Sequence, residues 1–262
     1  MVVCDEWIQK QIVYLNAFLG VYKPDPNAGF FFEPTPGFYG FIAQGHTDAL
    51  NEAIRMLAEH IGSPTAPIVE TWEGPSNPLV SAGHDWTNEI EPPGLIYYEG
   101  PYRSRIRISI VNKHSPLILG AVLAHELTHH YLATKYIGHD DEDENERLTD
   151  LATVFLGLGK LTVNGYEPVS WTVRRGGQDI TYTYRIGYLS SKELAQVFAH
   201  VCKFRHIPID RALTNLSTSA RRLVRSAYRR LDVRQRRKAR KEKLLRGVKH
   251  LFSRLLLRKR TQ

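Results

Sequence analysis

Apolar residues recur along the chain with two periods, one typical of helices and one typical of strands. Residues three or four apart share a face of a helix, whereas alternate residues share a face of a strand. The helical period marks residues 5–20 and 47–61, which we predict as helices. Their core-facing residues are expected to be Trp7, Ile8, Ile12, Leu15 and Phe18 in the first, and Leu50, Ile54, Leu57 and Ala58 in the second.

The period of two marks residues 104–112 and 179–187, which we predict as strands. In the first of them isoleucines alternate with arginine and serine, so one face is expected to be buried and the other exposed to solvent. This strand is either a plain core strand or one whose open edge pairs with an extended peptide. A further short strand is expected at 66–72 in a turn-rich stretch, and proline and glycine predict a loop over 23–40.

The middle of the chain carries a strong helix start signal. Ser115 and Pro116 are a typical N-cap followed by proline at the first helical position, and the helix is expected to run to about residue 136. An acidic surface loop at 139–146 should lead into a helix over about 144–158. Another helix is expected over 190–204. Since helices and strands both occur, we predict the α+β class.

Composition limits the kind of protein. The 262 residues suit one large domain or one domain with an appendage, and the two cysteines argue against a disulfide scaffold and against zinc held by cysteine. Asp5 and Glu6 stand where a secretory signal would carry basic and then apolar residues, so we expect a cytoplasmic protein.

Charge divides the chain unequally. Residues 221–262 hold 18 of the 35 Lys and Arg residues and two of the 27 acidic ones, so the net charge of +8 combines an acidic body with a basic end. We therefore expect a body over 1–215 and a basic, amphipathic helical tail over 216–262. The tail suits a nucleic acid, an acidic protein or an anionic membrane surface, or it packs on the body or on another copy.

The predicted helix at 116–136 contains the sequence H-E-x-x-H, formed by His125, Glu126 and His129. Histidines four residues apart in a helix lie on one face, one turn apart, so both can bind a single ion. Zinc accepts neutral imidazole readily, and a catalytic zinc site has three protein ligands and a water molecule. Glu126 lies beside the ligand face, where it can reach the water.

A third ligand is expected shortly after this helix. Glu146 and Asp150 are again four residues apart, and Glu146 would complete a His-His-Glu set. His139 and Asp140 are the alternatives. Asp150 is expected to accept the second N–H of a zinc-bound histidine and to fix its orientation.

Together these letters resemble the gluzincin metallopeptidases, the thermolysin-like class with H-E-x-x-H followed by E-x-x-x-D. Here the matching residues are H-E-L-T-H at 125–129 and E-R-L-T-D at 146–150, and the resemblance covers about residues 104–158. It implies a zincin-like fold, with a twisted sheet packed on the helix that carries the histidines. The longer metzincin pattern does not match, because Leu132 and Lys135 stand where that pattern has glycine and histidine.

The chemistry expected from these residues is hydrolysis of a peptide bond. Glu126 would act as the general base on a zinc-activated water. Tyr188 is a candidate donor to the oxyanion, with His200 and His206 as further candidates; alternatively, Tyr188 simply packs at a strand end.

Two other functions remain open from the sequence. One is a zinc-containing binding or regulatory protein with absent or latent peptidase activity, acting through its basic tail. The other is a zinc hydrolase with a non-peptide substrate.

Overall fold

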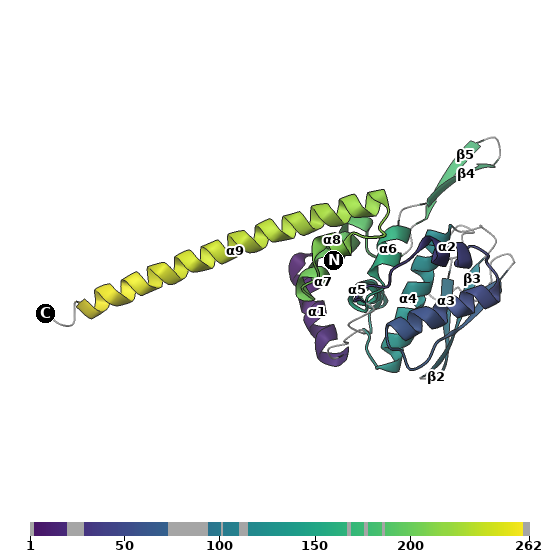
Figure 1. Cartoon of the computed structure of the whole chain (residues 1–262), viewed down its shortest axis with the longest axis horizontal. Helices are drawn as coiled ribbons and strands as arrows, with labels where there is room; N and C mark the ends of the chain where they lie inside the picture. Colours follow the sequence, from purple (N-terminus) through teal and green to yellow (C-terminus); the bar gives the residue numbers. More distant parts are fainter. Residues whose placement is uncertain are drawn as a thin grey trace.

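The computed structural model describes residues 3–19, 29–72, 94–100, 102–109, 115–166, 169–175, 178–184 and 187–258, and within them the protein is α+β (Figure 1). The helices are α1 (Asp5–Leu19), α2 (Pro36–Ile42), α3 (Thr47–His60), α4 (Pro116–Thr134), α5 (Glu142–Phe155), α6 (Gly159–Gly165), α7 (Ser191–Phe204), α8 (Ile209–Ala212) and α9 (Thr218–Arg258). The strands are β1 (Ile68–Trp72), β2 (Gly94–Gly100), β3 (Arg103–Ser109), β4 (Val169–Arg175) and β5 (Gln178–Tyr184). In this part of the chain no helix combines the length and the apolar character needed to cross a bilayer.

The described strands form a sheet in the order β1-β3-β2 and a separate β4-β5 hairpin. β1 runs parallel to β3, and β2 runs antiparallel to it. The predicted half-buried strand is confirmed, because Ile106 and Ile108 of β3 are buried. Its expected open edge is wrong: β3 is the central strand and has a partner on both sides. The edge strand that borders α4 is β2.

α4 lies at the centre of the body, between the helices α5 and α6 on one side and the sheet with α3 on the other (Figure 1). Ile118, Ala121 and Val122 belong to the core on the α5 side. Leu123 and Leu127 belong to the core under the sheet. Because both sides of α4 are covered, its sequence is apolar almost all round, and the polar side chains that it does carry are enclosed by protein.

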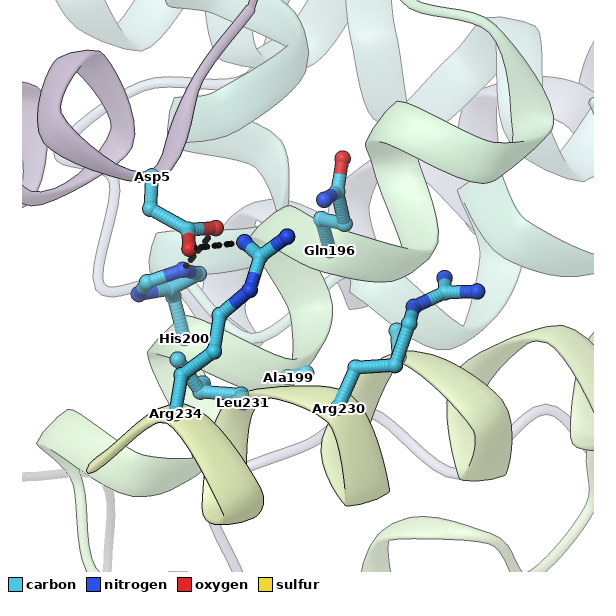
Figure 2. Close-up of a pocket in the computed structure, with 8 residues that line it drawn as sticks. Asp5, Gln196, Ala199, His200, Arg230, Leu231 and Arg234 are labelled. Carbon is cyan, nitrogen blue, oxygen red and sulfur yellow. Dashed lines mark hydrogen bonds and ion pairs between the residues drawn. The ribbon is translucent and has the colours of Figure 1, made fainter. Parts of the chain in front are cut away.

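α9 begins as part of the body. Ala220, Val224, Ala227 and Leu231 are spaced at three and four residues and are buried, and α9 packs on α7. The junction of α1, α7 and α9 also has a polar contact, shown in Figure 2: the carboxylate of Asp5 accepts a hydrogen bond from His200 Nε2 at 3.1 Å and another from the Arg234 guanidinium.

Several sequence-based boundaries need correction. Residues 36–40, the end of the expected loop, belong to α2, because the Thr35 side chain accepts a hydrogen bond from Phe38 N and Pro36 occupies the first turn. The helix expected from about residue 144 begins at Glu142, inside the acidic stretch. The Asp141 side chain caps it by accepting a hydrogen bond from Glu144 N. Phe18, expected in the core, is exposed. The elements β2, β4, α6 and α8 were not predicted, and Ile110 lies outside the described residues.

Candidate metal centre

Two histidines of α4 meet at one point, as their spacing predicts. His125 and His129 are buried, and their Nε2 atoms are 3.0 Å apart. Ser115 caps the helix and Pro116 occupies its first turn, so the helix start that the sequence predicts is present. The continuous helical backbone places the two imidazoles one turn apart on the same face.

Glu146 of α5 closes the group from the opposite side. Its Oε2 atom lies 3.1 Å from His125 Nε2 and 3.2 Å from His129 Nε2. Within the described residues these three side chains form the group of His, Cys, Asp or Glu that could hold a metal ion, with ligand atoms within 4.8 Å of one another. Separations of 3.0–3.2 Å are close to the ~3.3 Å between two zinc ligands at about 2.0 Å in a tetrahedral site.

The outer nitrogen of each imidazole is fixed by a partner. His125 Nδ1 donates to Asp150 Oδ1 at 3.0 Å. His129 Nδ1 lies 3.3 Å from the hydroxyl of Thr149, which itself donates to the Asn145 carbonyl at 2.9 Å and therefore accepts from the histidine. With both Nδ1 atoms protonated, a neutral imidazole has its lone pair on Nε2. Two lone pairs and the Glu146 carboxylate then converge without a donor, and this arrangement favours a cation.

The pKa shifts agree with a site that stabilises positive charge. Burial lowers the pKa of His125, but the neighbouring carboxylates of Asp150 and Glu146 outweigh burial and raise that pKa well above the usual value. For Glu146, burial raises the pKa, while the hydrogen bonds with the two histidines outweigh this and hold it far below its usual range. The two protein carboxylates thus attract either a proton or a metal ion to the histidine pair.

Asp150 is completely buried and connects the histidine to three other groups. Its Oδ1 accepts from His125 Nδ1 and from the hydroxyl of Tyr166. Its Oδ2 accepts from the backbone N–H groups of Tyr188 and Leu189, each at 2.8 Å. Since every one of these partners donates, the carboxylate is held in one orientation and holds the imidazole in turn.

Glu126 lies beside the ligand group on α4 and is not part of it. The side chain is 9% exposed, and among the described residues its carboxylate has no hydrogen bond. Burial raises its pKa, the two histidines lower it and Glu146 raises it, with an upward net shift. β2 covers this side chain closely: a Cβ atom on Gly94 would lie 3.5 Å from Glu126 Oε1. A buried carboxylate with a raised pKa and no fixed partner is well suited to accept a proton.

Two tyrosines lie within electrostatic reach of the site. Burial and then the carboxylate of Glu146 raise the pKa of Tyr188 to about 12. Tyr98 of β2, which the sequence did not single out, is about half exposed, and its pKa is raised by partial burial of the hydroxyl and by the carboxylates of Glu126 and Glu146. Both phenols are therefore protonated at neutral pH and can donate a hydrogen bond.

Other histidines considered from the sequence lie elsewhere. His130 contacts the hydroxyls of Ser104 and Thr65 on the sheet side of α4. His139 stacks against Tyr14 of α1, and His200 contacts Asp5 (Figure 2). Neither His139 nor Asp140 belongs to the ligand group.

Sequence reasoning missed Tyr166 and Thr149. Thr149 had a usable signal, because it follows Glu146 by three residues and so shares its face of α5. Tyr166 had none, since it follows α6, a seven-residue helix that the pattern did not predict.

Comparison of the chain with protein-family models, with curated proteins and with solved structures gave no match.

Proposed function

We propose that this protein is a zinc-dependent metallopeptidase with a zincin-like fold, in which His125, His129 and Glu146 hold the metal. The observation that carries the proposal is the convergence of two Nε2 atoms and a carboxylate on one point while Asp150 and Thr149 hold the outer nitrogens. A zinc ion bound there would lower the pKa of a coordinated water from 15.7 to about 7 and polarise a carbonyl group.

The residues around the ligands take complementary roles. Glu126 accepts a proton from the attacking water as its oxygen bonds to the scissile carbonyl carbon. Glu126 then delivers that proton to the departing nitrogen as the C–N bond breaks. Tyr98 and Tyr188, whose pKa values are both raised by the Glu146 carboxylate, are the candidate donors to the carbonyl oxygen, where negative charge develops. Asp150 and Tyr166 keep His125 oriented throughout.

The edge strand supplies a place for the substrate. β2 stands at the border of the described sheet, and its first residue, Gly94, lies against Glu126. An extended peptide added to β2 would continue the sheet by backbone hydrogen bonds and pass alongside Glu126. Peptide and protein substrates therefore fit this site better than small molecules do.

The test is metal analysis followed by digestion of a peptide library with wild type and three variants. We expect one zinc per chain and cleavage for the wild type, and loss of metal in His129→Ala and Glu146→Ala. Glu126→Gln should keep its zinc and lose about 10²–10⁴-fold in rate, because only the proton carrier is removed.

The outcomes separate the competing functions. A metal-free wild type, or unimpaired cleavage by Glu126→Gln, would refute the proposal. Zinc without cleavage of any peptide would favour a regulatory protein that acts through its basic helix, or a hydrolase with another substrate.

A further inference from the structure

The far half of α9 leaves the body. α9 is one helix of 41 residues, about 60 Å long at 1.5 Å per residue. Leu231 is the last of its described residues to be buried, whereas Val233, Arg234 and Arg237 are exposed. Figure 1 shows the helix continuing alone from the body to the C-terminal end of the chain.

The sequence of this projecting half has a distinct pattern. Seven apolar residues, at positions 244, 245, 248, 251, 252, 255 and 256, share an arc of about 140° on a continuous helix at 100° per residue, and Leu257 lies outside this arc. Between 234 and 258 there are 11 Lys and Arg residues and one acid, Glu242. A basic segment with an apolar side is typical of helices that lie in the plane of a membrane interface.

We propose that residues 233–258 of α9 bind an anionic lipid surface, with the apolar positions toward the acyl chains and the basic ones toward the headgroups. Such a surface is complementary to both features of the segment at once. The apolar positions begin 13 residues beyond Leu231, about 20 Å further along the axis, so the body does not obstruct their approach to a flat surface.

Other occupants match only part of the pattern. In a dimer formed through this segment, the 11 basic residues of one copy would face the 11 of the other and repel them. Each copy has a single acidic residue in the segment to offset that repulsion. A nucleic acid would use the basic residues through its phosphates and leave the seven apolar positions in water. The inference does not depend on the metal centre, since no residue of that site is involved.

The test uses the full-length protein and vesicles of phosphatidylcholine with and without phosphatidylserine. We expect co-sedimentation only with the phosphatidylserine vesicles, and its weakening as salt is raised, because the headgroup attraction is screened. Absence of binding to anionic vesicles would overturn the proposal, whatever the variants do.

A matched pair of double variants separates the apolar side from charge alone. Leu251→Asp with Phe252→Asp places two charges in the apolar arc, and Gln235→Asp with Ser253→Asp places two charges opposite it. We expect the first pair to weaken vesicle binding at least about tenfold more than the second. Equal losses would show that charge alone acts and would overturn the proposal. Tight binding of duplex DNA by wild type and by both double variants would also overturn the proposal. A dimer in analytical sedimentation that the first double variant dissociates would overturn it as well.

Discussion

Tyr166 has a measurable role at the scale of single residues, because its hydroxyl donates to the carboxylate that orients His125. Tyr166→Phe removes this donor and leaves the ring in place. We expect about 10–100-fold weaker zinc affinity, as for other residues that support a ligand through one intermediate group. Competition with a chelating dye would measure it.

Tyr131→Phe is the matched control for that prediction. Tyr131 is also a buried tyrosine, but it belongs to the core under the sheet. An affinity unchanged in Tyr166→Phe, or reduced equally in both variants, would mean that the hydroxyl does not act on the ligand.

The sequence could predict most of the group that could hold a metal ion because its geometry is local. A separation of four residues on a capped helix determines that His125 and His129 face the same way, and the same spacing pairs Glu146 with Asp150. That Glu146 rather than His139 joins the histidines depends on where α5 packs against α4. Tyr98 and Tyr166 come from elements whose approach is decided by tertiary packing, which no local pattern encodes.

At the scale of elements, the close packing of β2 against α4 is expected to depend on the absence of a side chain at Gly94. A Cβ atom at this position would lie 2.4 Å from Val122 Cγ1 of α4, so Gly94→Ala requires the Val122 side chain, the strand or the helix to move. We expect a loss of about 1–3 kcal/mol in the free energy of unfolding, measured by denaturant titration. Gly40→Ala in α2 is the control, because nothing lies within 4 Å of its added Cβ. Equal effects would show that the contact with α4 is not tight.

The contact between α1 and α9 should make stability depend on pH. Burial raises the pKa of Asp5, but its hydrogen bonds to His200 and Arg234 outweigh burial and lower it below 3.8. A lowered folded-state pKa means that the carboxylate stabilises the fold above the unfolded value and that this contribution is lost as pH falls through the folded one.

Unfolding titrations below about pH 4 would measure this contribution. We expect the free energy of unfolding to fall more steeply with decreasing pH in wild type than in Asp5→Asn. Asp48→Asn, at an exposed position of α3, should retain the wild-type slope. Parallel curves for wild type and Asp5→Asn would contradict the prediction.

Long helices with a clear period or a strong start signal were predictable, and short helices were not. α1, α3, α4 and α7 each span 14 or more residues with clear periodicity or a strong cap, and all four were expected. α2 and α6 have seven residues each, too few for a period to show. β2 reads G-L-I-Y-Y-E-G and does not alternate, because its strand form depends on pairing with β3.

At the scale of the whole molecule, α9 should divide into a stabilising half and a dispensable one. A chain ending at Arg237 retains Ala220, Val224, Ala227 and Leu231. We expect its free energy of unfolding to lie within about 0.5 kcal/mol of the full chain, as for other surface changes. Leu231→Ala in the full chain should cost about 2–5 kcal/mol, because it empties a buried position. A truncation as costly as Leu231→Ala would show that the projecting half supports the body.

The basic end was predictable as a helix, and packing on the body was among the alternatives, but the residues that pack were not predictable. Charge and periodicity marked residues 218–260 as one amphipathic segment, whereas the burial of Val224 and Leu231 depends on the face that α7 presents.

The stiffness of α9 gives the molecule a fixed reach. An unbroken helix is rigid, so residues 233–258 lying along a bilayer would hold the body beside the membrane in one orientation, whereas a flexible linker would let it rotate freely. If the two proposals hold together, the bonds cleaved would be those that a membrane-bound substrate presents at the height of the metal centre. Removing one residue beyond Leu231 would turn the body by about 100° about the helix axis, and so turn the metal centre toward the bilayer or away from it.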